Sequence, residues 1–236
     1  MVDNALQPCF ILHRREYRNT SLLLELFTPE QGRLPAIARG ARSGRSMLGA
    51  LLQPFRPLLV SLKGRGEVKT LSKSEPEGRA LLLQGNHLYC GFYLNELLTR
   101  LLQREDPHPQ LFLHYSNTLA ALATAEPMEA VLRHFELELL DELGYGLLLD
   151  QEADNGDKIE AERLYEFHIE HGPVVFETGR TRSPMVVHGA TMLGMHRRDF
   201  SERRTIQEAR GLMRRVLAFY LGNKPLKSRE LFRSTP

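Results

Sequence analysis

The stretch PCFILHRREYRNTSLLLELFTPEQGRLPAIARG, residues 8–40, decides the fold of the first third of the chain. It opens a series of β-rich runs with short turns between them, at residues 8–17, 20–28, 33–40, 53–62 and 67–75. Pro54 and Pro57 place the fourth run at the start of a strand or at a sheet edge. Five short strands with glycine-rich turns predict a small β-barrel or β-sandwich.

The hydrophobic pattern changes to a period of three to four residues from about residue 79. We expect helices from there to Leu143, with Pro127 near the start of the last of them and Gly144 and Gly146 after its end. A further helix is expected to open on a capping box, Thr205-x-x-Glu208, and to run to Leu221.

A polar loop at 150–162 and a strand pair at 163–179 interrupt the helical pattern, and the pair is expected to turn at His171-Gly172-Pro173. The boundary between the two patterns falls at SEPEGR, near residues 76–80. The sequence therefore predicts an α+β protein with two domains. These are a β-rich domain at 1–79 and a mostly helical domain at 80–236 that contains a β-hairpin within 150–180 and a basic C-terminal tail.

The formal net charge of +2 hides a strong segregation of charge along the chain. Residues 1–80 carry 13 Lys and Arg against 7 Asp and Glu, and residues 178–236 carry 13 against 4. Residues 81–177 between them carry 5 against 18. Such segregation indicates surfaces that face a polyanion, next to surfaces that face solvent or a protein partner.

The main functional signal is IARGARSGRS, residues 37–46, in which three arginines stand three residues apart among Gly, Ala and Ser. Glu67 is the lone acid in residues 31–73, against nine Lys and Arg. Phosphate neutralisation uses several cations along a groove, and small residues let the backbone approach a nucleic acid closely. The alternative for such a charge run is a solvated surface loop. The candidate phosphate-binding residues are Arg33, Arg39, Arg42, Arg45, Lys63, Arg65 and Lys69.

Nothing in the sequence argues for catalysis. It contains no nucleotide-binding glycine loop, no zinc-protease motif and no serine-hydrolase motif. Cys9 and His13 fall on one expected strand in an apolar context, which favours a core thiol over a nucleophile. Cys9 and Cys90 are the two cysteines, and they indicate free thiols in a reducing compartment. We therefore predict that the protein is not an enzyme.

Two candidate metal sites do not fit the spacing that metal ligands need. A calcium loop centred on Gly156 would place ligands at Gln151 and Ala153, which breaks the pattern. His168 and His171 would not converge in a strand or a turn, and no cysteine lies near them in the sequence. We expect no metal and no other cofactor. Because no run of about 18 apolar residues occurs, we also expect no membrane span.

Four blocks of the chain resemble the bacterial RecO family of recombination mediators and DNA repair proteins. They are GRLPAIARGARSGRSMLGALLQPFRPLLVSLKGRGEVKTL (32–71), GFYLNELLTRLL (91–102), LRHFELELLDELGYG (132–146) and GNKPLKSRELF (222–232). The match continues in order over nearly the whole chain. The resemblance implies an N-terminal OB-fold barrel, in agreement with the five expected strands, followed by a mostly helical domain.

The resemblance also implies a function. Proteins of this family bind single- and double-stranded DNA, anneal complementary strands and help to load RecA onto coated single strands. They act with RecR and with the C-terminal tail of the single-stranded-DNA-binding protein, and they are not enzymes. A cytoplasmic, nucleoid-associated location follows from this activity.

Specific residues are implied by the family pattern. The basic positions matching the family's DNA contacts are Arg33, Arg39, Arg42, Arg45, Arg65 and Lys69, with Lys227 and Arg229 of the tail motif as further candidates. The helical block at 132–140 would contribute Arg133, Phe135 and Leu139 to a pocket for the acidic, apolar partner tail, with Arg133 contacting its carboxylate. Some relatives carry a four-cysteine zinc site after LGYG, and this chain has no cysteine there, so we predict no zinc.

Two other functions stay open on the residues alone. An RNA-binding OB-fold protein would use the same phosphate-tracking groove. A protein adaptor without DNA affinity would instead work through the acidic middle of the chain. Competition between matched DNA and RNA strands, and binding of a peptide ending in Asp-Ile-Pro-Phe, would distinguish them.

Overall fold

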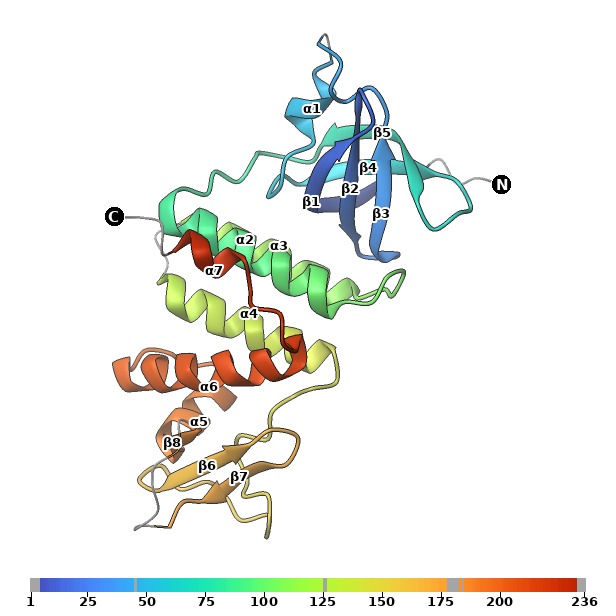
Figure 1. The fold of residues 1–236 in the computed structure, drawn as a ribbon. Helices are drawn as coiled ribbons and strands as arrows, with labels where there is room; N and C mark the ends of the chain where they lie inside the picture. Colours follow the sequence, from blue (N-terminus) through green and yellow to red (C-terminus); the bar gives the residue numbers. More distant parts are fainter. Residues whose placement is uncertain (1–4, 45, 125–126, 178–182, 184, 233–236) are drawn as a thin grey trace. The chain divides into compact units, whose positions relative to one another are not determined.

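The computed structural model describes residues 5–44, 46–124, 127–177, 183 and 185–232. They form two compact units, the first built from residues 1–126 with 226–236 and the second from 127–225 (Figure 1). The C-terminal segment therefore returns to the first unit. The helices between residues 85 and 122 also belong to this unit, together with the β-rich part of the chain.

The first unit begins with a closed barrel of five strands in the order β1-β2-β3-β5-β4. Strand β4 closes the barrel by pairing with β1, and β3 and β5 pair in parallel. This arrangement confirms the expected five-stranded barrel and the α+β class. The strands are β1 (Gln7–Tyr17), β2 (Ser21–Thr28), β3 (Gly32–Ala38), β4 (Leu58–Lys63) and β5 (Lys69–Pro76).

The barrel core is filled by side chains that point inward from each strand. Leu22, Leu24 and Leu26 of β2 are buried, whereas Leu23 and Glu25 between them are half-buried on the outer face. Successive side chains of a strand point to opposite faces, so one run supplies both the core and the outer surface. The same core contains Cys9, Ile11, Leu34, Ala36, Leu58 and Val60.

The fourth predicted strand, at 53–62, was wrong at its start. A short helix, α1 (Leu48–Leu51), precedes β4, and the chain turns at Phe55 before β4 begins at Leu58. Phe55 has a φ of +64° and is buried, and its ring packs edge-on against Phe92 at 5.1 Å between centroids. Phe55 is therefore a packing residue of the first unit.

Helices α2 (Gly85–Leu101) and α3 (Pro109–Leu122) complete the first unit. The side chains of Phe10 in β1 and Phe27 in β2 point out of the barrel. They pack against Phe112 and Tyr115 of α3, with ring centroids 5.1–6.1 Å apart. Aromatic pairs at such distances bury large apolar areas. One part of the outer surface of β1 and β2 is thus covered by α3.

The tail motif docks on α2 as a short helix, α7 (Ser228–Leu231) (Figure 1). Leu226 is buried, and the carboxylate of Glu96 accepts hydrogen bonds from the backbone amides of Lys227 (2.9 Å) and Ser228 (2.8 Å). These amides have no partner within so short a helix, and a carboxylate at a helix start satisfies them.

The second unit combines helices with a small sheet. The expected hairpin is present, but it turns at residues 169–171, because Gly172 and Pro173 already pair with β6. A third strand, β8, pairs with the other edge of β6 to give the order β7-β6-β8. The elements described for this unit are α4 (Met128–Glu142), β6 (Leu164–His168), β7 (Gly172–Val175), β8 (Val186–His188), α5 (Gly189–His196) and α6 (Arg203–Leu221).

The predicted capping box of the last long helix was wrong. Helix α6 begins at Arg203, two residues before Thr205, and its N-cap residue makes no side-chain cap. Glu208 instead accepts hydrogen bonds from the backbone amide of His188 (2.9 Å) and the hydroxyl of Thr191 (2.7 Å). Its side chain therefore holds the start of α5, a contact that long-range packing creates.

Candidate nucleic-acid interface

Four exposed arginines lie where β1 turns into β2 and where β3 ends. Arg39 follows the last residue of β3, and Ala38 pairs with Leu22 at the start of β2. The backbone amide of Arg42 donates to the carbonyl of Thr20 at 2.8 Å, which ties the loop after β3 to the β1–β2 turn. We call Arg15, Arg18, Arg39 and Arg42 the first cationic group.

Sequence reasoning missed two members of this group. Arg15 and Arg18 belong to HRREYR, residues 13–18, which reads as a strand and its turn. Only the pairing of β1 with β2, and of β2 with β3, places them beside the arginine loop. The density of arginine in this short segment was the available signal.

A second cationic group lies at the turn between β4 and β5. Lys63 ends β4, Arg65 is exposed in the turn, and Lys69 begins β5. Lys69 pairs with Ala36, so the turn lies beside the middle of β3. Five-stranded OB barrels bind oligonucleotides across β2 and β3 and with the loops that join β1 to β2 and β4 to β5. Arg18 lies in the first of these loops and Arg65 in the second. Arg39 and Arg42 lie in the loop after β3, which the hydrogen bond from Arg42 to Thr20 holds beside the β1–β2 turn.

The outer face of β2 and β3 lies between the two groups. Leu23 and Ile37 are opposite each other on this face and are half-buried. Phe27 is the aromatic residue on these two strands, and it is fully buried under α3. No described residue of β2 or β3 therefore offers an exposed aromatic ring on which a base could stack.

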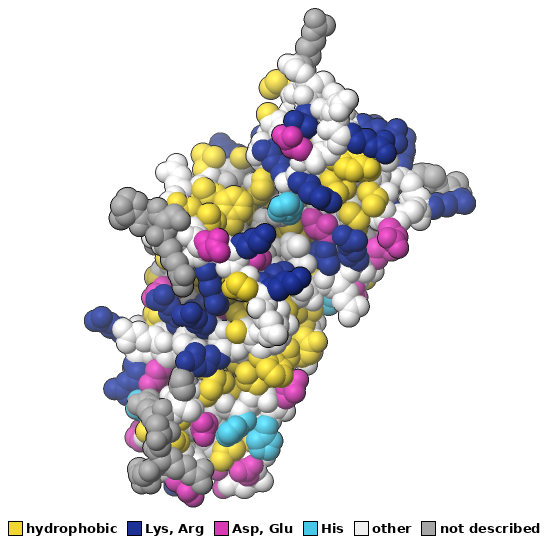
Figure 2. Space-filling model, in the orientation of Figure 1, with side chains coloured by type: hydrophobic (Ala, Val, Ile, Leu, Met, Phe, Trp, Pro, Cys, Tyr) yellow, Lys and Arg dark blue, Asp and Glu magenta, His cyan; other side chains and the backbone are white. Residues whose placement is uncertain are grey.

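The basic side chains of the two groups differ in whether they already form an ion pair within the protein. Among the described residues, Arg39, Lys63 and Arg65 make no ion pair, so their charges face solvent. Arg42 pairs with Glu16 at 2.8 Å, and Lys69 pairs with Glu105 at 2.9 Å. The Arg42–Glu16 pair is exposed and therefore weak, because water and salt compete with it, whereas the Lys69 side chain is only 18% exposed. Figure 2 shows Lys and Arg side chains together with acidic ones on the barrel.

Arg33 lies at the other end of β3 and is not part of either group. Its guanidinium pairs with Glu25 and donates to the carbonyl of Leu102 at 3.1 and 3.0 Å. Only 13% of its side chain is exposed. Arg33 thus fastens the end of α2 to the barrel. Arg45 lies outside the described residues.

The other predicted positions lie elsewhere. Lys227 is exposed and Arg229 is half-buried on α7, which packs against α2. Arg133, Phe135 and Leu139 of α4 are all buried. Nε of Arg133 donates to Oε2 of Glu136 at 2.7 Å, so its charge is paired inside the protein. The structure does not bring these three residues to an open surface.

The candidate nucleophile and metal sites can also be located. Cys9 is fully buried, and burial raises the pKa of its thiol well above the ordinary range, while His13 on the same strand is exposed. The ring centroids of His168 and His171 are 6.4 Å apart. No cluster of three or more His, Cys, Asp or Glu suited to a metal occurs within the described part of the chain.

Comparison with known proteins gives the family. The model of the recombination protein O N-terminal domain matches residues 1–78, and the model of the C-terminal domain matches residues 82–230. The chain belongs to the RecO family. This family acts in DNA repair and recombination, and its members are mediators, not enzymes.

Individual RecO proteins are similar over nearly their full length. The DNA repair protein RecO of Methylococcus capsulatus is 51% identical over 230 residues, which cover 98% of this chain and 93% of the relative. The RecO proteins of Dechloromonas aromatica and Pasteurella multocida are each 47% identical, and the matches cover 96% of this chain and 94% and 93% of those relatives. Among the described helices, none is both long and apolar enough to cross a membrane.

Proposed function

We propose that this RecO-family protein binds single- and double-stranded DNA through the two cationic groups of its barrel and anneals complementary strands. The observation that carries the proposal is that both groups flank the outer face of β2 and β3, which has no exposed aromatic residue in its described part. Cations that hold phosphates across a face without a row of stacking rings leave the bases free to pair, and the ring of Tyr17 beside the first group lies under the guanidinium of Arg18, 5.3 Å from its centroid.

Annealing requires that the mutual repulsion of two polyanions be reduced. Arg39, Lys63 and Arg65 supply unpaired charge on flexible side chains, and the neighbouring Arg42 needs only to exchange an exposed carboxylate for a phosphate. Phosphate contacts do not depend on the base sequence. The proposed binding is therefore independent of sequence and strongly dependent on salt.

The proposal extends to the partners of the family. The protein would assist the loading of RecA onto single strands coated by the single-stranded-DNA-binding protein, together with RecR. Docking of the acidic partner tail at α4 would require the buried pair of Arg133 and Glu136 to open. A peptide ending in Asp-Ile-Pro-Phe, titrated against Arg133→Ala and the unchanged protein, tests whether this position takes part.

Fluorescence anisotropy with a labelled single strand at several salt concentrations tests the DNA interface. The variant Arg39→Gln/Arg65→Gln should bind more weakly, and the slope of log K against log salt should flatten by about 0.7 for each phosphate that the variant leaves without a cation. Arg163→Gln/Arg210→Gln, which removes two exposed arginines of the second unit, is the matched control. An unchanged slope in Arg39→Gln/Arg65→Gln would remove these loops from the DNA site.

A strand-annealing assay with and without the coating protein completes the test. The Arg39→Gln/Arg65→Gln variant should anneal more slowly in both conditions, because both depend on phosphate contacts. Competition with a matched RNA strand separates this function from RNA binding, since phosphate contacts alone do not distinguish the two.

A further inference from the structure

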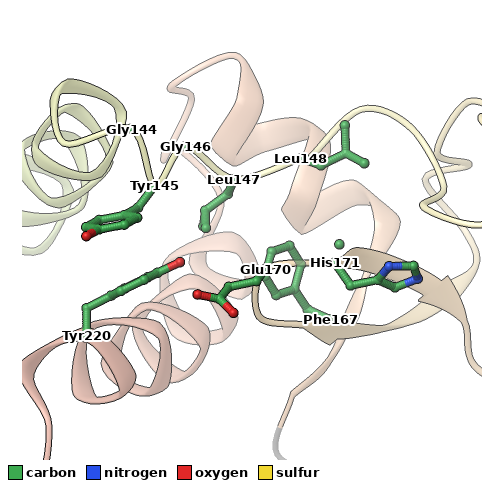
Figure 3. Close-up of a pocket in the computed structure, with 10 residues that line it drawn as sticks. Gly144, Tyr145, Gly146, Leu147, Leu148, Phe167, Glu170, His171 and Tyr220 are labelled. Atoms are coloured by element: carbon green, nitrogen blue, oxygen red, sulfur yellow. The ribbon is translucent and has the colours of Figure 1, made fainter.

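A pocket of about 410 Å³ in the second unit has no part in the proposed DNA interface (Figure 3). It is formed by three segments that are distant in sequence: the chain after α4, the turn between β6 and β7, and the end of α6. Its side chains include Tyr145, Leu148, Phe167, Glu170 and Tyr220. No lysine or arginine is among its described lining residues.

Two tyrosines form one wall of the pocket. Gly144, two residues after the end of α4, has a φ of +78°, and the amide of Tyr145 donates to the carbonyl of Leu140 at 2.8 Å. This helix ending turns the chain so that Tyr145 meets Tyr220 of α6. The rings are stacked with their centroids 4.2 Å apart and an angle of 19° between their planes. Tyr145 stays 43% exposed, so the stack is open to a ligand.

A carboxylate faces this aromatic wall. Glu170 lies in the hairpin turn with a φ of +67°, a conformation that costs a residue with a side chain about 1–2 kcal/mol. Figure 3 shows its side chain directed into the pocket, toward Tyr220. Burial, the charge of Glu170 and the neighbouring Tyr145 raise the pKa of Tyr220, which agrees with this placement. Among the described residues Glu170 has no ion-pair partner.

The surrounding charge decides what the pocket can bind. Residues 141–177, which supply two of the three lining segments, carry 11 acids against Lys158 and Arg163, and residues 216–223 around Tyr220 carry no charged side chain. Nε2 of His171 lies 3.0 Å from Oδ1 of Asp154. His171 therefore interacts with Asp154 and does not balance the charge of Glu170. A phosphate or an acidic peptide would be repelled. A neutral apolar group would bury Glu170 without a partner, which is costly.

A cationic ligand fits the stacked tyrosines, the carboxylate of Glu170 and the acidic surroundings of the pocket. Guanidinium groups stack flat on aromatic rings and pair with carboxylates through two parallel hydrogen bonds. Lysine offers a point charge and lacks the planar face that the stacked tyrosines match. From the combination of the stacked Tyr145–Tyr220 pair and the unpaired Glu170, we propose that this pocket binds an arginine side chain presented by a partner protein.

NMR titration of the ¹⁵N-labelled full chain with N-acetylarginine amide tests the proposal. Saturable shifts are expected at the amides of Gly144, Gly146 and Gly172, which line the pocket. N-acetylcitrulline amide has nearly the same shape without the charge, and it should bind about tenfold more weakly. Equal shifts with citrulline, or arginine shifts confined to other residues, would overturn the proposal.

Variants locate the interaction. Glu170→Gln, at an exposed turn position, should weaken arginine binding about tenfold, because the stacking surface remains but the charge pair is removed. Glu162→Gln is the charge-matched control, since Glu162 is exposed and lies outside the pocket lining. A single-stranded oligonucleotide and an acidic peptide form two further arms. If either shifts the three glycine amides, the pocket serves an anion and the arginine site is refuted, whatever the result for DNA at the barrel.

Discussion

Nζ of Lys69 lies 2.9 Å from the carboxylate of Glu105, which follows α2 in the sequence. The backbone holds Glu105 in place, because its amide donates to the carbonyl of Arg33 at 2.9 Å. One member of the second cationic group is therefore already paired with an internal anion. The Glu105 side chain is 53% exposed and that of Lys69 is 18% exposed, so this carboxylate competes with a DNA phosphate for the Lys69 ammonium.

Replacing this carboxylate should strengthen DNA binding. In Glu105→Gln, Lys69 has no ion pair to break and can contact a phosphate without displacing an acid. The slope of log K against log salt should steepen by about 0.7 on single strands, which corresponds to one further phosphate neutralised. Fluorescence anisotropy measures both quantities. Glu30→Gln, at the exposed β2–β3 turn, changes the net charge equally, and the same increase in that control would contradict a specific role for Glu105.

Gly32 should be essential for docking the α2–α3 connection on the barrel. It has a φ of +62°, and a Cβ atom at this position would lie 1.9 Å from the carbonyl oxygen of Asp106. Gly32→Ala should lower the free energy of unfolding by more than about 3 kcal/mol, measured by urea denaturation. Gly40→Ala isolates the backbone cost, because Gly40 has a φ of +69° and open space around its Cβ position. That control should be destabilised by only about 1–2 kcal/mol, and equal effects would show that the contact with Asp106 is unimportant.

The contacts of Glu208 predict a pH-dependent contribution to stability. Burial opposes ionisation of this carboxyl, but donors from His188 and Thr191 outweigh it and lower its pKa in the folded protein. In the acid range the unfolded chain therefore binds more protons at this position. The contribution is complete above the pKa of the unfolded chain and is lost as the pH falls through the lower, folded-state pKa.

Glu208→Gln measures this contribution. At neutral pH its free energy of unfolding should be about 1–3 kcal/mol below that of the unchanged protein, because charged acceptors are replaced by neutral ones. The difference should shrink as the pH is lowered towards about 3. Urea denaturation at several pH values tests this. Glu202→Gln, an exposed N-cap residue without a side-chain cap, should show no difference at any pH, and a constant difference for Glu208→Gln would contradict the assignment.

Glu96 should hold the C-terminal motif on α2. Burial of this carboxyl is outweighed by the amides of Ser228 and Lys227 and by Arg100, which together lower its pKa. In Glu96→Ala, the amides of Lys227 and Ser228 should exchange with deuterium at least about tenfold faster, since their acceptor is removed. Lys227→Ala keeps the backbone amide and alters only an exposed side chain, so exchange at Ser228 should not change. Unchanged exchange in Glu96→Ala would show that Leu226 and the ring contact of Phe232 with Tyr89 suffice.

Much of the fold follows from local patterns. The run at 8–17 became β1 almost without change, because a short β-rich run bounded by turn residues is a property of neighbouring positions. The fourth predicted strand, at 53–62, began too early in the chain. Phe55 lies in a turn, and the packing of its side chain against Phe92 stabilises that turn. The capping box failed for a related reason. The carboxylate of Glu208 accepts hydrogen bonds from His188 and Thr191, which lie 20 and 17 residues earlier in the chain. It therefore does not cap the start of its own helix.

The sequence by itself determined the class of the fold, the concentration of positive charge near residues 37–46 and the resemblance to the RecO family. Tertiary structure decided which charges are open to a ligand. Arg39 and Arg33 stand six positions apart on the same β-rich run, yet Arg39 faces solvent while Arg33 is bound to Glu25 and to Leu102, 69 residues away. Local sequence sets the conformation of the backbone and the identity of a charge. Whether that charge is available depends on the partners that folding brings to it, and those come from distant parts of the chain.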